Sequence, residues 1–297
     1  MIEPLRFGLI GVDSSHALQF TRLLADGRGR VQGATVISAW KGPTSADFPP
    51  SRDRNDSNAD ALAGLGVELL GSAQEVAEAS DALLLVSSDV RTRREQFERI
   101  APFGKPVYVD TRFAANVQDA RKMLQTADAH DCLVLSGSPK RFTPQVQGIL
   151  SSDVSSIDLS GPIVVQPGHP GLAWYGVHLV DLAVAALGPG CDRVEPGSEG
   201  LRLLWDDGRS ATISGPAEWN PWTRGRARTS DGDIEFEIEA NEGMLVGLLE
   251  SVISSYRQGT VIIAHGEILE IAAIVQAGSA AIADGRSHAL RSPGAGR

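Results

Sequence analysis

The sequence predicts an α/β protein in which a doubly wound parallel sheet is followed by an α+β domain with a mostly antiparallel, open sheet. Two patterns support this prediction. In the first half of the 297-residue chain, short apolar runs alternate with amphipathic runs, as in βαβ units. After about residue 137, strand-like runs follow one another with turn signals between them. We therefore divide the chain into domains at residues 1–137 and 138–297, because a chain of this length suits two cores.

Six short apolar segments are the expected strands of the first domain. They lie at residues 5–11, 34–40, 67–70, 82–87, 107–110 and 132–136. The first helix is expected to begin at Ser14 or Ser15, because either side chain can cap a helix. Further helices are expected at residues 73–78, 91–100 and 116–130. The segment 41–58 is polar and rich in Pro and Asp, which predicts a long loop.

The second domain is expected to place helices on one face of its sheet. Strands are expected at residues 157–166, 202–205, 210–214 and 234–238, and helices at residues 174–187, 242–257 and 268–282. The sequence DDG at residues 206–208 predicts a hairpin turn between two of the strands.

Composition excludes several classes of protein. The chain is 42% hydrophobic and 22% charged, which is ordinary for a globular protein and excludes a disordered or fibrous one. Its net charge of -10 would repel a phosphate backbone, so we expect no nucleic-acid partner. The N-terminal residues lack the pattern of a signal peptide, and no apolar run approaches membrane-spanning length. We therefore expect a cytoplasmic protein with no membrane partner.

Cysteine usage argues against structural metal or disulfide chemistry. Cys132 and Cys191 are too few for a disulfide framework or a four-ligand zinc site. No His, Cys or Asp cluster has metal-ligand spacing, so we expect no metal site. Both cysteines are expected to be buried thiols.

The segment GLIGVDSSH follows the first strand, where a dinucleotide-binding loop would lie. In the G-x-G-x-x-G pattern that starts at Gly11, Asp13 and His16 occupy the second and third glycine positions. Asp13 adds bulk and negative charge where the backbone must approach a pyrophosphate. Two interpretations stay open: Ser14 and Ser15 only cap a helix, or the segment is a modified phosphate loop.

The second strand ends without the acidic residue that commonly binds an adenosine ribose. Trp40 and Lys41 stand there instead. Lys41 could accept a 2'-phosphate and Trp40 could stack on adenine, which favours NADP if a nicotinamide cofactor binds. A solvent-facing lysine beside a surface aromatic residue is the alternative.

Five segments, in order along nearly the whole chain, resemble one protein family. They are FGLIGVDSSH, GKPVYVDTRFA, KRFTP, WYGVHLVDLAVAALG and YRQGTVIIAHGEILEIAAIVQAGSAA. Their order is similar to that of the Gfo/Idh/MocA family of NAD(P)-dependent sugar and cyclitol oxidoreductases. The resemblance implies a Rossmann-type dinucleotide-binding first domain. It also implies a second domain that binds substrate and pairs its sheet with another subunit, which gives a homodimer or homotetramer.

The resemblance assigns a set of cofactor-binding residues to the first domain. These are Gly11, Asp13, Ser14, Ser15, His16, Trp40, Lys41, Ser87, Ser88, Asp110 and Thr111. The family's Glu-Lys-Pro motif, whose lysine lies near nicotinamide and substrate, corresponds to Asp110, Thr111 and Arg112. Threonine cannot move a proton as lysine does. Arg112 could supply a fixed cation in its place, although it is a poor proton shuttle.

The family's other catalytic site is an Asp four residues before a His. His178 matches the histidine, but Trp174 stands in the Asp position. His178 is our candidate for general acid-base chemistry, and Asp181, one helical turn later, is expected to orient it. A histidine packed at the domain boundary is the alternative.

Several further residues are candidates for substrate binding. They are Lys140, Arg141, His169, Trp174 and Tyr175. Lys140 and Arg141 could grip an acidic or polyhydroxylated substrate, or form a solvated interdomain salt bridge. The aromatic residues could stack on a sugar ring, with core packing as the alternative for each.

We therefore expect an enzyme that transfers a hydride between NAD(P) and a hydroxyl or carbonyl of a sugar-like, cyclitol or other small polar substrate. The alternative is a divergent family member that acts as a lyase, an isomerase or a ligand-binding regulatory protein. The departures at Asp13, Trp40, Thr111 and Trp174 favour that alternative.

Overall fold

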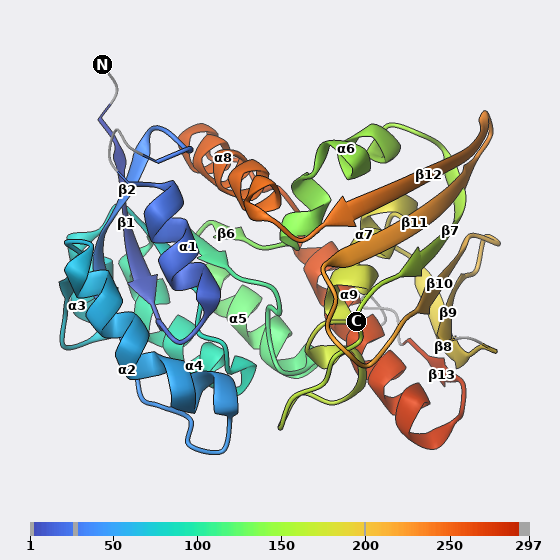
Figure 1. Ribbon diagram of the computed structural model, residues 1–297, viewed down its shortest axis with the longest axis horizontal. Helices are drawn as coiled ribbons and strands as arrows, with labels where there is room; N and C mark the ends of the chain where they lie inside the picture. Colours follow the sequence, from blue (N-terminus) through green and yellow to red (C-terminus); the bar gives the residue numbers. More distant parts are fainter. Residues whose placement is uncertain (1–2, 26–28, 199, 291–297) are drawn as a thin grey trace. The chain divides into compact units, whose positions relative to one another are not determined.

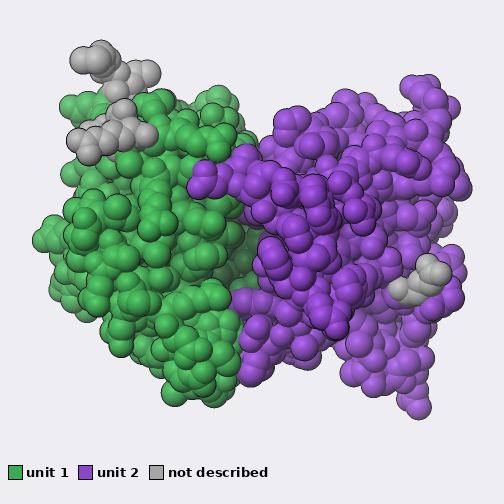
Figure 2. Space-filling view, viewed as in Figure 1, with its two compact units in different colours: residues 1–136, 245–263 green, residues 137–244, 264–297 purple. Residues whose placement is uncertain are grey.

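The computed structural model describes residues 3–25, 29–198 and 200–290 and divides the chain into two compact units. Unit 1 comprises residues 1–136 and 245–263, and unit 2 comprises residues 137–244 and 264–297 (Figure 2). Each unit contains one large sheet, of six strands in unit 1 and seven in unit 2. The two sheets are of different kinds, parallel in unit 1 and mostly antiparallel in unit 2, as the sequence predicts.

Unit 1 is built on a parallel sheet with the strand order β3-β2-β1-β4-β5-β6 (Figure 1). Its strands are β1 (Leu5–Ile10), β2 (Ala34–Trp40), β3 (Glu68–Leu69), β4 (Ala82–Leu85), β5 (Val107–Val109) and β6 (Val134–Leu135). The strand β4 is buried along its whole length, as expected for a central parallel strand covered on both faces. The order reverses between β1 and β4, and ligands of such sheets bind at the carboxyl ends of the strands at this point.

The helices of unit 1 include one that the sequence analysis missed. They are α1 (Ser15–Leu23), α2 (Pro49–Gly64), α3 (Ala73–Ala79), α4 (Val90–Ile100), α5 (Val117–Ala129) and α8 (Glu242–Gln258), with a 3-10 turn η1 (Ala101–Phe103). The prediction of a loop over residues 41–58 is wrong, because α2 begins at Pro49. Its buried positions include Ser51, Asn55, Asn58 and Leu62, which are at helical spacing. Three of its six buried residues are polar and Leu62 is the one large apolar side chain among them, so hydrophobic periodicity could not reveal the helix.

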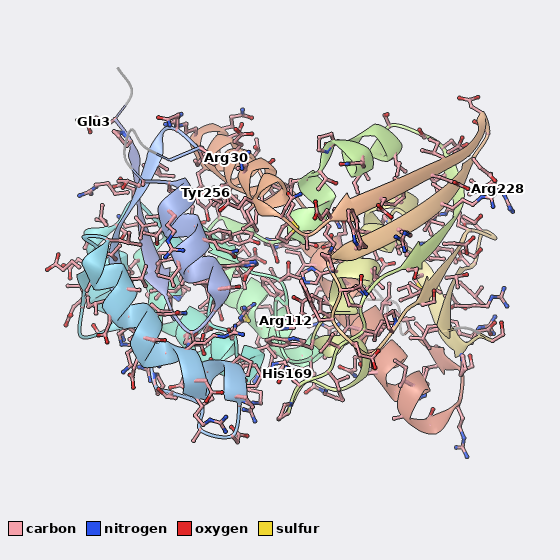
Figure 3. The ribbon with its side chains drawn as sticks, in the orientation of Figure 1. Glu3, Arg30, Arg112, His169, Arg228 and Tyr256 are labelled. Carbon is pink, nitrogen blue, oxygen red and sulfur yellow. The ribbon has the colours of Figure 1, made fainter. Side chains whose placement is uncertain are left out.

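The helix α8 follows unit 2 strands in the sequence but packs in unit 1. We expected it in the second domain, whereas residues 245–263 belong to unit 1. Tyr256 of α8 is labelled in Figure 3. Its ring lies 5.7 Å from that of Phe7 on β1, and its hydroxyl donates to the carbonyl of Leu83 on β4. Arg257 donates to the carbonyl of Gly33. The apolar face of α8 therefore covers the parallel sheet, which nothing in its local sequence could show.

Unit 2 is built on a sheet with the strand order β12-β11-β7-β10-β9-β8-β13. Its strands are β7 (Val154–Ser160), β8 (Cys191–Pro196), β9 (Gly200–Trp205), β10 (Ser210–Ser214), β11 (Trp222–Thr229), β12 (Gly232–Glu239) and β13 (His288–Ala289). All neighbours are antiparallel except β7 and β10. The hairpin predicted at residues 206–208 joins β9 to β10, and Gly208 there has a φ of 92°.

The helices of unit 2 pack on one face of this sheet. They are α6 (Pro144–Leu150), α7 (Val177–Leu187) and α9 (His265–Asp284), with 3-10 turns η2 (Pro139–Phe142) and η3 (Gly171–Ala173). The core joins apolar residues of α7 and α9 to the inner faces of β7, β9 and β10. Glu270 on α9 accepts hydrogen bonds from the backbone of Gly190 and Cys191, which fixes the helix to the start of β8. Among the described residues, α9 is long and apolar enough to cross a membrane, a test that core helices of globular proteins also pass.

Candidate functional site

The loop between β1 and α1 lies against the end of β4. Gly11 has a φ of 77°, and a Cβ added to it would lie 2.5 Å from the Cβ of Ser87. Only glycine permits this approach, because a side chain would collide with the loop after β4. The Ser87 hydroxyl donates to Gln96 at 2.7 Å. Of the three glycine positions in the G-x-G-x-x-G pattern, the loop retains only Gly11, and packing against Ser87 requires a glycine there.

Asp13 turns its carboxylate toward the backbone of the β4 loop. Its Oδ1 accepts a hydrogen bond of 2.6 Å from the amide of Ser88, and the side chain is buried. Asn58 on α2 holds the same loop by donating to the carbonyls of Val12 and Ser14. The residue in the second glycine position thus joins two loops at the carboxyl edge of the sheet.

Ser14 caps α1, as one of the two interpretations predicted. Its Oγ accepts a hydrogen bond of 3.1 Å from the amide of His16, and Ser15 is the first residue of the helix. A capped helix terminus still places positive dipole charge at the loop, so capping does not exclude phosphate binding.

His16 in the first turn of α1 and Asp110 just after β5 form a hydrogen-bonded histidine–carboxylate pair. The imidazole Nδ1 donates to Asp110 Oδ2 at 2.7 Å. The other carboxylate oxygen accepts from the hydroxyl of Tyr108 at 3.2 Å and from the amide of Thr111 at 3.0 Å. Burial raises the pKa of the Asp110 carboxyl, but the charge and hydrogen bond of His16, with nearby arginines, outweigh it and bring the pKa to about 2. Asp110 is therefore an anion at neutral pH.

A fully buried arginine, Arg93 on α4, lies behind this pair. Its Nε and Nη2 donate to the carbonyl of Ser87 at 2.8 and 2.6 Å, and its Nη1 donates to the carbonyls of Asp110 and Arg112. Arg93 thus joins the ends of β4 and β5. We missed it in the sequence, although the apolar stripe of α4 at Val90, Phe97 and Ile100 includes position 93. A charged residue at a buried helical position was the available signal.

The remaining first-domain candidates lie at the same edge of the sheet, with partners of their own. Arg112 donates to the carbonyl of Ser88 at 3.1 Å. Lys41 forms an ion pair with Asp56 on α2, and Arg99 lies 6.0 Å above the ring of Trp40. The Lys41 ammonium is therefore already paired with a carboxylate that a 2'-phosphate would have to displace.

The carboxyl edge of unit 1 fits a dinucleotide. The N-terminus of α1 offers backbone amides and positive dipole charge of the kind that binds a pyrophosphate. The charge of Asp13 opposes this, yet the Ser88 amide occupies one of its oxygens. Gly11, Ser14, Ser15 and Ser88 would contact the phosphates, and Asp110 and Thr111 lie at the neighbouring strand end. These roles stay predictions.

A second polar cluster lies in unit 2, around Arg141 on η2. Arg141 is buried and donates to Asp181 Oδ1 at 2.9 Å and to Glu267 at 2.5 Å. Its Nη2 also donates to the carbonyl of Asp181. The alternative of a solvated interdomain salt bridge is wrong for Arg141, because both partner carboxylates belong to unit 2 and the pair is buried.

His178 joins this cluster through a serine. Its Nδ1 lies 2.8 Å from the hydroxyl of Ser138, whose amide donates to Asp181 Oδ2 at 3.2 Å. We predicted that Asp181 orients the imidazole. In the structure, Ser138 links His178 to Asp181. The other carboxylate oxygen of Asp181 accepts a hydrogen bond from Arg141.

Lys140 is buried beside this cluster. Only 5% of the residue is exposed, and burial lowers the pKa of its ammonium to about 8. A lysine with such a pKa can give or take a proton near neutral pH, unlike one at the surface. Of the two interpretations of Lys140, the solvated salt bridge is wrong because the amine is buried, and the substrate contact stays a prediction.

The aromatic candidates form a row of ring contacts that ends at His178. His169 packs 5.3 Å from Trp174, Trp174 packs 6.4 Å from Tyr175, and Tyr175 packs 5.7 Å from His178. Trp219 donates its indole N–H to the hydroxyl of Tyr175 at 3.0 Å. His169 is fully buried, packs against Trp174, and has its Nδ1 3.0 Å from the carbonyl of Pro167.

The cysteines confirm the expected buried thiols. Cys132 and Cys191 are both free and buried, and burial raises the pKa of each thiol to about 12. Within the described ranges, no group of three or more His, Cys, Asp or Glu side chains is placed to hold a metal ion.

Comparisons with protein-family models and with curated proteins found no match. Solved structures do match, over nearly the whole chain. The chain is similar to a probable dehydrogenase from Thermotoga maritima, with a TM-score of 0.79, 15% identity, and coverage of 96% of this chain and 99% of that one. Against myo-inositol 2-dehydrogenase from Lactobacillus plantarum, the TM-score is 0.78 at 13% identity, with coverage of 97% and 100%.

A third similar structure contains a cofactor. It is an oxidoreductase from Agrobacterium radiobacter in complex with NAD+, L-tartaric acid and magnesium, with a TM-score of 0.73, 15% identity, and coverage of 96% of this chain and 98% of that one. Identity this low establishes the fold and leaves the activity to be argued from the site. The chain therefore shares the fold of these solved dehydrogenase structures over nearly its whole length.

Proposed function

We propose that this protein is an NAD(P)-dependent oxidoreductase that transfers a hydride to or from a hydroxyl or carbonyl of a sugar-like, cyclitol or other small polar substrate. The main support is the similarity of the whole chain to dehydrogenases, among them one in complex with NAD+. The carboxyl edge of unit 1 adds local support, because the N-terminus of α1 lies there and can bind a pyrophosphate.

The nicotinamide group would supply the hydride chemistry, and the protein would bind, orient and move protons. In unit 2, Lys140 and His178 are the groups suited to proton transfer with a substrate, because burial lowers the pKa of Lys140 to about 8 and an imidazole is the usual acid-base group of enzymes. Tyr175 lies against His178 and offers an aromatic face and a hydroxyl to a polyol. We propose NADP over NAD because β2 ends without an acid, with the 2'-phosphate displacing Asp56 from Lys41.

A non-redox lyase, isomerase or ligand-binding protein is the second candidate. Asp13 places a carboxylate beside the expected phosphates, and Thr111 stands in the position of the family's lysine. Both changes would follow if the chain no longer used a dinucleotide.

Calorimetric titration with NADH, NADPH, NAD and NADP distinguishes the two candidates, after any cofactor retained from purification is removed. We expect micromolar binding of at least one form. Asp13→Asn keeps an acceptor for the Ser88 amide and removes the charge, so it should tighten binding by up to about tenfold. A folded protein that binds none of the four, as wild type and as this variant, would favour non-redox chemistry. Binding would justify a turnover screen with myo-inositol, scyllo-inositol and L-tartrate.

We also propose that the open face of the unit 2 sheet forms a homodimer or homotetramer. This face is hollowed by about 910 Å³ and is lined by alternating charges such as Arg224, Arg226, Glu235 and Glu237. Two copies could pair opposite charges across it. Light scattering should show a multimer that Arg226→Glu weakens, whereas a wild-type monomer at micromolar concentration would contradict the proposal.

A further inference from the structure

We propose that His16, oriented by Asp110, is a catalytic acid-base residue that performs the proton transfer expected of the family's missing lysine. This proposal rests on the proposed function and adds a residue that the sequence suggested only as a cofactor contact. It is carried by a histidine-carboxylate pair at the carboxyl edge of the sheet, 94 positions apart in the chain.

The imidazole is held in one orientation. Nδ1 is fixed by Asp110 at 2.7 Å, and the ring stacks on Phe20 with centroids 5.0 Å apart and an interplanar angle of 21°. The side chain keeps 19% of its surface exposed. A neutral ring that gives its Nδ1 proton to a carboxylate has its free lone pair on Nε2. The arrangement therefore fixes both the tautomer and the plane of the ring.

The Asp110 carboxylate, which orients His16, is held in place by several hydrogen-bond donors. Both oxygens of Asp110 accept hydrogen bonds, one from His16 and the other from Tyr108 and Thr111. The main-chain carbonyl of the same residue accepts from the buried Arg93. These donors hold the Asp110 carboxylate in one orientation toward His16, so Asp110 acts as a positioning residue.

The position of Asp110 next to Thr111 supports an acid-base role for His16. Asp110 directly precedes Thr111, which stands where the resemblance puts the acid-base lysine. Threonine has no group that titrates near neutral pH, and Arg112 keeps its proton. His16 is hydrogen-bonded to Asp110, the residue next to Thr111, and it carries an imidazole, the group that enzymes use most often for proton transfer.

In the oxidation of a secondary alcohol, the substrate loses one proton and one hydride. The O–H bond of the substrate breaks, and its proton passes to Nε2 of His16, which becomes an imidazolium stabilised by Asp110. The hydride on the same carbon leaves for the oxidant, NAD(P), and that carbon becomes a carbonyl. In the reverse direction the imidazolium returns the proton to the carbonyl oxygen.

The first test needs no substrate. Long-range 1H–15N NMR of 15N-labelled protein, with the His16 signals assigned by comparison with His16→Gln, reports which nitrogen of the neutral ring carries the proton. We expect Nδ1–H in the wild type and a shift toward Nε2–H in Asp110→Asn, because the asparagine amide can donate to Nδ1. A neutral wild-type ring with its proton on Nε2 would overturn the proposal.

The second test is kinetic and uses the inositols and L-tartrate. His16→Ala and His16→Gln should each lower kcat by about 10²–10⁴ while the calorimetric Kd for the cofactor changes less than about threefold. Added imidazole should restore part of the His16→Ala activity, which a purely structural role would not allow. His130→Ala, at an exposed position on the end of α5, is the matched control and should leave kcat unchanged.

The outcomes separate this proposal from the proposed function. If the Kd for the cofactor rises with kcat unchanged, His16 is a cofactor contact and the acid-base role is wrong. If the wild type binds no dinucleotide, the proposed function fails, and the role of His16 in hydride transfer fails with it even if the tautomer is as expected. If the wild type turns over and both His16 variants match it, the proposed function stands and this inference alone is wrong.

Discussion

The two units each bury an arginine, and the two arginines have different kinds of partner. Arg93 in unit 1 donates to backbone carbonyls at the ends of β4 and β5. Arg141 in unit 2 donates to the carboxylates of Asp181 and Glu267. In unit 1 the nearby carboxylate of Asp110 is thus left to bind a histidine.

This difference decides what each histidine can do. His16 has a carboxylate on Nδ1, whereas the Nδ1 of His178 lies against the hydroxyl of Ser138. A carboxylate stabilises an imidazolium far better than a hydroxyl does. The unit 2 histidine that the sequence favoured therefore has the weaker orienting partner, and the unit 1 histidine has the stronger one.

The largest expected effect comes from removing each arginine. Arg141→Met leaves two buried carboxylates without their cation and should lower the free energy of unfolding by about 3–5 kcal/mol. Arg93→Met leaves buried carbonyls without donors and should cost a similar amount. Urea denaturation at pH 7 and pH 5 separates the two, because protons can neutralise carboxylates and cannot neutralise carbonyls. The decrease in the free energy of unfolding should therefore be smaller at pH 5 than at pH 7 for Arg141→Met, and unchanged for Arg93→Met.

Arg94→Met is the matched control for this comparison. Arg94 neighbours Arg93, is 40% exposed, and pairs with Glu98 and Asp119 at the surface. Its loss should cost at most about 1 kcal/mol. If Arg93→Met costs no more than this control, the buried guanidinium does not join the strand ends as we describe.

A smaller effect is expected for Lys140→Met, with the opposite sign. Burial lowers the pKa of Lys140 to about 8 from 10.5. Below pH 8 the amine is charged in both states, so its desolvation destabilises the fold by about 2–3 kcal/mol, which methionine would recover. Between pH 8 and 10.5 the folded state has already lost the proton. Wild-type stability therefore rises, and the difference in unfolding free energy between wild type and Lys140→Met becomes smaller. A gap that stays constant from pH 7 to pH 10 would contradict this.

The smallest effect is expected for Asp110→Asn, on the order of 1–2 kcal/mol at pH 7. The pKa of Asp110 is lowered to about 2 in the folded protein, so its contribution is present above the unfolded value near 3.8. That contribution is lost as the pH falls from 4 toward 2. Acid unfolding followed by circular dichroism should therefore bring wild type and variant together at low pH. Curves that stay parallel would show that the pair does not stabilise the fold.

Local patterns determined the two sheets and many of the elements that build them. Continuous apolar runs such as Ala82–Leu85 gave the parallel strands, and the serine before α1 gave its cap. The DDG segment gave the β9–β10 hairpin. Each of these depends on residues within a few positions, where side-chain spacing and turn chemistry act directly. The resemblance to dehydrogenases added the fold of the whole chain.

Only the tertiary structure decided the partners in the candidate site. Asp13 finds the Ser88 amide 75 positions away, His16 finds Asp110, and α8 returns to the sheet of unit 1. These contacts depend on which strand lies beside which and on where each strand ends, and no local pattern fixes either. The polar buried face of α2 was hidden for a related reason, since hydrogen bonds to distant loops replace apolar contacts there. The sequence by itself therefore determined the layers, and strand order determined the chemistry at their edge.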